Sequence, residues 1–329
     1  GLSHDLWIEE ANKSDELDSI GLDDSLNGLE DSFWRAKIKP VQFSEEKIGT
    51  EQEAHLKKAI YLLESFRDGS LKPSEVFDTD QLAKVMAIRA IIGSAEFDWM
   101  DTKFYYNPKT SLLEPISKEA HVDLTTNFEE HYFSWWIDSS KIRSFYIKNT
   151  NFFLDILYSD KGFYKKYLSE LNRLSKTKYL EDLIEENLQD FKKYKKILNQ
   201  NYPTKEIFSK KHLEVTRIRI QDFLNPVQGL NVYFKDYKDS FLILDISNLQ
   251  RLPVEILGIE FNDSSKIYLK EPLLIEGKKP LKPLENNFVK IDCQSREDCK
   301  KLLIEQQQIV FKILGQEKEI KAEILKHYK

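Results

Sequence analysis

The hydrophobic pattern of the chain changes near residues 205–212, and this change limits the fold more than any other feature of the sequence. Before it, apolar residues recur at the three-to-four-residue spacing of amphipathic helices. After it, short alternating runs separated by Gly, Pro, Asn and Asp are typical of β-sandwich strands. The 329 residues are therefore predicted to form an α+β chain, with a mainly helical domain at 1–206 and a β-sandwich at 207–329. Pro203 and the Lys-rich segment 205–211 form the predicted linker.

Charge and composition exclude several classes of protein. The 49 basic and 55 acidic residues give a net charge of -6, whereas a general nucleic-acid binder needs a basic surface, so no nucleic-acid partner is expected. Aromatic residues make up 12% of the chain, which excludes bulk disorder. No stretch approaches the ~20 consecutive apolar residues of a transmembrane helix. Lysine runs at 192–193 and 195–196 indicate a solvated helix face, with a phosphate-binding stripe as the alternative.

The start of the chain and the cysteines bear on export and redox state. The sequence begins with Gly1 rather than Met and lacks a signal-peptide pattern, so we expect a processed or trimmed product. Cys293 and Cys299 are too few ligands for a metal site. They are either free thiols or a small-loop disulfide, which requires the segment to turn back on itself.

Two helices are predicted from their capping signals. Thr50–Glu53 forms a capping box, and Gly69 is expected to end the helix that follows. Asp78–Gln81 opens a second helix, in which apolar residues recur at helical spacing until Gly93 closes it.

The remaining part of the first domain is predicted from periodicity alone. Residues 1–49 are acidic and short of a regular pattern. From about 127 to 200 the pattern is helical, and its last part is predicted as one helix over 180–198. Tyr202-Pro203 is predicted to end the helical region.

A β-hairpin is predicted between these helices. Lys103–Tyr106 has the composition of a strand, Asn107–Thr110 has turn chemistry, and Leu112–Ile116 is the returning strand. A hairpin brings the residue before its first strand near the residue after its second.

Acidic residues cluster around this hairpin. Glu96 and Asp98 lie after the helix that Gly93 ends, Asp101 lies just before the first strand, and Glu119 lies just after the second. We expect Asp101 and Glu119 to approach each other, with Glu96 or Asp98 alongside. Three converging carboxylates suit Mg²⁺ or Ca²⁺, which take oxygen ligands. The alternative is that they are ordinary surface acids beside a turn.

Common catalytic motifs are missing. The sequence has no Gly-rich phosphate loop, no His-Glu-x-x-His, no Gly-x-Ser-x-Gly and no Cys-x-x-Cys. Its six histidines are scattered, and His121 and His131, which lie nearest the hairpin, are interpreted as structural or surface residues.

Three phrases of the sequence resemble the CotH kinase family, the spore-coat protein CotH and its secreted bacterial relatives. They are Val76–Lys84 with Ile91–Gly93, Trp99–Pro108, and Leu113–Ile116. Leu252–Ile259 also resembles the domain that follows the kinase-like part in long members. The resemblance implies an atypical kinase-like carboxy-terminal lobe, followed by the β-sandwich.

The resemblance also implies a metal-dependent phosphotransferase that uses ATP with Mg²⁺ or Mn²⁺. In the family an Asn and an Asp hold the metal, and their places are taken here by Asp101 and Glu119. The candidate catalytic base falls at Glu96 to Asp98. The Asn-to-Asp change adds a negative charge and the Asp-to-Glu change moves a carboxylate, and both alter a site that requires accurate distances. We therefore expect a pseudokinase, inactive as it stands.

The family places an amino-terminal lobe with a nucleotide-gripping Lys before residue 1, and residues 1–40 resemble the end of that lobe. Family members are secreted or belong to the bacterial cell envelope. The resemblance therefore implies an extracellular or envelope location, with a protein or glycan of the envelope as partner.

Two further hypotheses stay open at this point. The first is a non-catalytic carbohydrate- or protein-binding module of the envelope, which would use exposed aromatic side chains between Phe128 and Trp136. These are Phe128, Tyr132, Phe133, Trp135 and Trp136. The second is an independent metal-dependent hydrolase that would use Asp98, Asp101 and Glu119, although a base with a supporting partner is missing.

Overall fold

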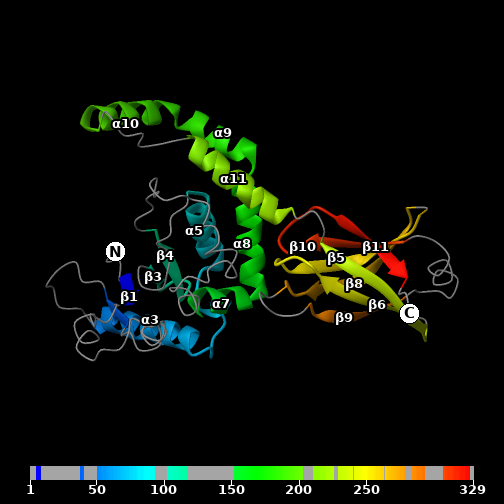
Figure 1. The fold of residues 1–329 in the computed structure, drawn as a ribbon. Coiled ribbons are helices and arrows are strands. Elements are labelled where there is room, and N and C mark those ends of the chain that lie inside the picture. The colour runs from blue at the N-terminus through cyan, green and yellow to red at the C-terminus, as the bar shows by residue number, and fades with distance from the viewer. Residues whose placement is uncertain are drawn as a thin grey trace, which may run out of the picture. The chain divides into compact units, whose positions relative to one another are not determined.

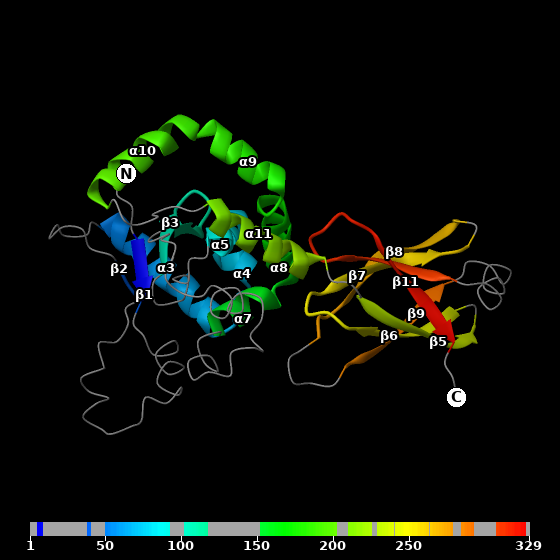
Figure 2. The ribbon, with the colours of Figure 1, turned by 45° about the horizontal axis from the view of Figure 1, so that its top comes forward.

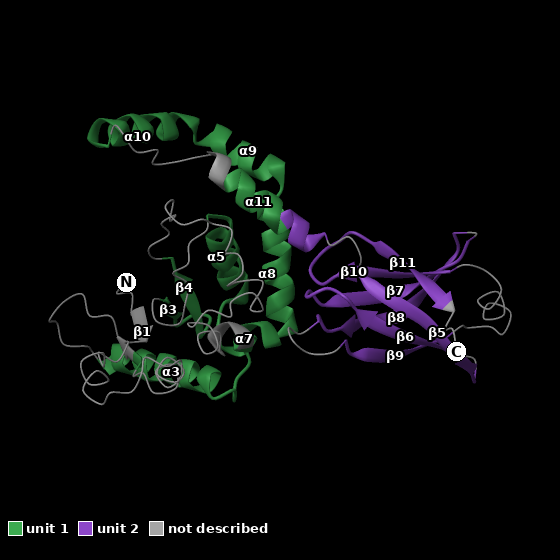
Figure 3. Cartoon of the chain, viewed as in Figure 1, with its two compact units in different colours: residues 1–220 green, residues 221–329 purple. Residues whose placement is uncertain are grey.

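The structure is a computed structural model with an α+β fold, and the chain divides into two compact units, 1–220 and 221–329 (Figure 3). It describes residues 5–8, 38–40, 50–92, 102–117, 152–202, 210–225, 229–239, 241–262, 264–278, 284–292 and 307–326. Within this described part, none of the helices combines the length and apolarity that a bilayer crossing requires.

Unit 1 contains a four-stranded antiparallel sheet and most of the helices (Figure 1). The sheet order is β2-β1-β3-β4, and its strands are β1 (Asp5–Ile8), β2 (Ile38–Pro40), β3 (Lys103–Asn107) and β4 (Leu112–Ile116). The helices are α3 (Thr50–Arg67), α4 (Pro73–Val76), α5 (Thr79–Ile92), α7 (Phe152–Ser159), α8 (Lys161–Leu174), α9 (Thr177–Glu186), α10 (Leu188–Asn201) and α11 (Lys210–Leu224).

The predicted hairpin and the two capped helices are confirmed. β3 and β4 pair antiparallel, with Lys103 opposite Ile116 and Asn107 opposite Leu112. α3 ends at the predicted place, where Gly69 adopts a φ of 77°, a left-handed conformation that glycine adopts without strain. α5 begins directly after Asp78.

The core of unit 1 forms where α5 packs against α8. These helices lie side by side in both views (Figures 1 and 2). Their buried apolar residues recur at helical spacing, which is the reason for the packing. On α5 they are Leu82, Ala83, Met86, Ala87 and Ala90, and on α8 they are Phe163, Tyr167, Leu168, Leu171 and Leu174.

Two predictions about helix ends are wrong. The single helix predicted over 180–198 is two helices, α9 and α10, which meet at Asn187. The side-chain amide of Asn187 donates to the carbonyl of Leu183, so it satisfies a terminal carbonyl of α9. Tyr202-Pro203 does not end the helical region either, because α11 follows.

Helix α11 formed despite a run of β-branched residues because of its spacing. Leu213, Thr216, Ile220 and Leu224 follow one another at intervals of three or four, and all four are buried. The predicted boundary between 206 and 207 lies outside the described residues, and the two compact units divide further along, within α11.

Unit 2 is a seven-stranded mixed sheet in the order β8-β7-β10-β11-β5-β6-β9. The strands are β5 (Leu230–Lys238), β6 (Phe241–Asn248), β7 (Val254–Glu260), β8 (Lys266–Ile275), β9 (Asn286–Asp292), β10 (Gln308–Ile313) and β11 (Ile320–Lys326). β11 and β5 run parallel, and every other neighbouring pair is antiparallel. The edge strands β8 and β9 approach each other, so the sheet curves around its core.

Apolar and polar residues alternate along these strands, and the apolar ones form the core of unit 2. Six of the seven strands coincide with the alternating apolar runs of the sequence, which lie at 230–234, 241–246, 254–256, 267–269, 309–314 and 320–324. β9 is the exception because Asn, Lys and Asp interrupt it. The inward-facing side chains form one apolar cluster that includes Leu244 of β6, Ile256 of β7 and Phe311 of β10. At this level the prediction of a β-rich second part is confirmed.

Asp160 connects two helix starts in unit 1. Its Oδ1 accepts from the backbone N–H groups of Gly162 (2.9 Å) and Phe163 (3.1 Å) at the start of α8. Its Oδ2 accepts from the N–H of Ser74 in α4, at 3.2 Å. One carboxylate therefore satisfies terminal N–H groups of two separate helices.

Replacing Asp160 with Ala should lower the free energy of unfolding by about 1–2 kcal/mol, because the cap of α8 and the link to α4 are both lost. Asp160→Asn is the matched control and should lose less, since Asn caps helices about as well as Asp. Urea unfolding of the full chain, followed by circular dichroism, measures both. Equal losses in the two variants would show that the charge matters rather than the cap.

Candidate functional site

The candidate acids Glu96, Asp98, Asp101 and Glu119 all lie outside the described residues. The described frame around them consists of the end of α5 and the open end of the hairpin, where Lys103 faces Ile116. The convergence of Asp101 with Glu119 therefore stays a prediction.

The hairpin is fixed to the start of α5 by a buried aromatic contact. The ring of Phe77 lies 5.0 Å from the ring of Phe104 on β3 and 4.9 Å from that of Phe66 on α3, centroid to centroid. Phe77 also forms a β-bridge with Leu113 on β4. Phe77, Phe104 and Leu113 are each at most 1% exposed. Burial of such rings stabilises the frame by an amount on the order of 2 kcal/mol for each side chain.

A backbone hydrogen bond also holds the hairpin to the start of α5. The N–H of Asp78 donates to the carbonyl oxygen of Leu113 at 2.9 Å. The residue that caps α5 is thus bonded directly to the returning strand of the hairpin.

The Asp78 carboxylate is a helix cap. Its Oδ1 accepts from the N–H groups of Asp80 (3.1 Å) and Gln81 (3.0 Å), and its Oδ2 accepts from the Gln81 side chain at 2.9 Å. Partial burial alone would raise the pKa of Asp78, but these hydrogen bonds and the nearby charge of Lys166 outweigh it and lower the pKa. An ionised carboxylate already bonded through both oxygens is suited to structure rather than to proton transfer.

Lys166 of α8 binds the same helix start. Its Nζ lies 2.7 Å from Oγ1 of Thr79 and 3.0 Å from Oδ1 of Asp80. Sequence analysis did not identify this residue, because its partners lie more than 80 positions earlier in the chain. Asp160 was missed too, although an Asp directly before a periodic helix is a capping signal that could have found it.

The second carboxylate cap also has a shifted pKa. Partial burial acts to raise the pKa of Asp160, but hydrogen bonds from Phe163, Ser74 and Gly162 outweigh it and lower the pKa. The two capping carboxylates thus favour their ionised forms in the folded state.

Within the described residues, no three side chains of His, Cys, Asp or Glu are grouped so that they could hold a metal ion. His55 of α3 lies against the ring of Tyr106 at 5.6 Å, a packing contact with the hairpin. His121, His131, Cys293 and Cys299 lie outside the described residues.

The aromatic residues proposed for envelope binding, from Phe128 to Trp136, also lie outside the described part. The lysine-rich segment can be assessed, because Lys192, Lys193, Lys195 and Lys196 are all exposed on α10. This agrees with the prediction of a solvated helix face.

Comparison with known proteins gives no relative for this chain: no family model, no curated protein and no solved structure matches it.

The lowered pKa values predict an acid-sensitive frame. A group whose folded pKa lies below its unfolded value of about 3.9 stabilises the fold above that pH, and this contribution is lost as the pH falls through the folded pKa. The stability difference between the wild type and Asp78→Asn should therefore be larger at neutral pH than in acid below the folded pKa. Guanidinium unfolding over a pH series measures it, and a difference that stays constant across the series would contradict the assignment.

Proposed function

We propose that unit 1 is the carboxy-terminal lobe of a CotH-kinase-like fold whose phosphotransfer site is degenerate. Unit 2 is then the β-sandwich that follows this lobe in long family members. On this proposal the chain is a pseudokinase of the bacterial cell envelope or secreted fraction, and its partner is a protein or glycan of the envelope.

One observation carries the proposal. The phrases that resemble the family are separate in sequence, yet the buried contact of Phe77 with Phe104 and Leu113 joins one residue from each of them. These residues build one buried contact, and a buried contact of this kind is where a shared fold concentrates sequence similarity. The further bond from Asp78 to Leu113 strengthens this argument.

The phrase in the second unit supports the proposal in a weaker way. Leu252–Ile259 leads into β7 and supplies most of it, and Val254, Ile256 and Ile259 from this phrase are buried in the core cluster. The phrase therefore has a structural role that a related domain would preserve.

The degenerate part of the proposal depends on the two changed ligand positions. Asp101 introduces a charge where the family has a neutral Asn, and Glu119 is longer than the family Asp by one methylene. Because metal ligation requires distances within a few tenths of an ångström, the two changes act together against a phosphate-bound metal.

Restoring the family residues tests the proposal. The full wild-type chain should show no micromolar binding of ATP in the presence of Mn²⁺, measured by isothermal titration. The variant Asp101→Asn/Glu119→Asp should bind Mn²⁺-ATP at least about ten-fold more tightly than the wild type, a change of about 1.4 kcal/mol. Binding should disappear when EDTA removes the metal.

A matched control makes the same two changes on α9, Asp182→Asn/Glu185→Asp, and should bind like the wild type; Glu185 is exposed, and Asp182 is partly exposed and paired with Lys178. Micromolar binding by the wild type would overturn the degenerate site. A double variant that folds, by circular dichroism, but binds no better than the wild type would overturn the assignment of these two ligand positions.

A further inference from the structure

A second candidate site lies on the outer face of the unit 2 sheet, on β5, β6 and β9. Leu242, Leu244 and Ile246 of β6 point into the core, and successive side chains of a strand point to opposite faces. Asp245 and its neighbours at alternate positions therefore face away from the core.

The strand register places Asp245 between two aromatic residues. It lies opposite Tyr233 of β5 on one side and opposite Phe288 of β9 on the other. Neighbouring strands are about 4.8 Å apart, so the three side chains form a short row across the face. Phe288 is 57% exposed and Tyr233 is partly exposed, so the two ends of the row are accessible, whereas Asp245 between them is buried.

One oxygen of the Asp245 carboxylate lacks a hydrogen-bond partner among the described residues. The residue is only 8% exposed, and its Oδ1 is buried with no hydrogen-bond donor among the described residues. A buried acceptor without a donor costs on the order of 1–3 kcal/mol, more when charged. A bound group that donates a hydrogen bond would remove this cost.

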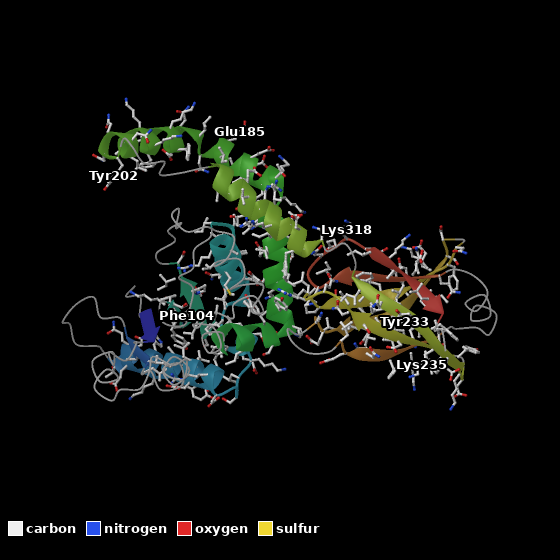
Figure 4. The ribbon with its side chains drawn as sticks, viewed as in Figure 1. Phe104, Glu185, Tyr202, Tyr233, Lys235 and Lys318 are labelled. Carbon is white, nitrogen blue, oxygen red and sulfur yellow. The ribbon has the colours of Figure 1, made fainter. Side chains whose placement is uncertain are left out.

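Charges around the row argue against an ionic ligand. Lys235 of β5 (labelled with Tyr233 in Figure 4) places its Nζ 3.6 Å from the centre of the Phe288 ring. The Lys235 ammonium group repels a cationic ligand, and the Asp245 carboxylate repels an anionic one. Ser247 donates to Asn286 at 2.9 Å on the same face, which adds uncharged polar groups.

We propose that this face binds a neutral glycan. Sugar hydroxyls are the donors that an acceptor-only carboxylate requires, and the C–H faces of a sugar ring pack against aromatic rings. A few polar groups among aromatic side chains are typical of small-molecule sites. The proposal assigns a site in unit 2 and holds independently of the phosphotransfer proposal for unit 1.

The test uses the full chain and four neutral hexasaccharides: those of cellulose, xylan, mannan and laminarin. Isothermal titration should detect binding of at least one of them. Phe288→Ala should weaken that binding by about ten-fold, the loss typical of truncating a central aromatic contact. Asp245→Asn, which keeps the shape of the side chain, should weaken it to a similar extent.

Tyr268→Ala is the matched control, because Tyr268 is an aromatic residue of the same sheet that is 51% exposed but lies on β8. This variant should bind like the wild type. Binding of none of the four probes overturns the proposal, as does binding that Phe288→Ala and Asp245→Asn leave unchanged. Preference for polygalacturonate or for a lysine peptide over all four would assign the face to a charged ligand and would also overturn it.

Discussion

The attachment of the β3–β4 hairpin to the start of α5 is the contact on which the described part of unit 1 depends. Phe77 supplies a buried ring and Asp78 supplies both a cap for the helix and an N–H for Leu113. Since these two residues are adjacent, burial, capping and strand attachment all act at one point. A loss at this point would weaken the link between the helix and the hairpin, while α5 stays packed against α8 and β3 stays paired with β1.

Local signals allowed much of this frame to be predicted from the sequence. The hairpin follows from turn residues between two apolar runs, and the start of α5 follows from Asp78 at a capping position. The bridge from Lys166 to the same helix start was not predictable, because a sequence does not show which distant helix packs beside α5. α11 was missed because β-branched residues gave its sequence the appearance of strands, although Thr216 and Ile220 are buried at helical spacing.

The two candidate sites differ in how far their residues can be predicted from the sequence. Asp101 and Glu119 were found because they flank a predictable hairpin, and their meeting remains a prediction. The row of Tyr233, Asp245 and Phe288 was not found, because its members come from three strands whose pairing and register are set by tertiary packing. β9 in particular gives a weak strand signal, and without it Asp245 has an aromatic neighbour on one side only.

The two proposals are compatible because the residues that stabilise the fold of unit 1 differ from the proposed metal ligands. The frame is held by Phe77, Asp78 and Asp160, and none of these is a proposed metal ligand. On the proposal for unit 1, the changed ligands at Asp101 and Glu119 would therefore remove phosphotransfer without removing the fold. The outer face of the second sheet has its own core beneath it, so recognition there does not require an intact phosphotransfer site. A chain of this kind can lose a reaction while it retains a binding function, which is the physical basis for considering it a pseudokinase.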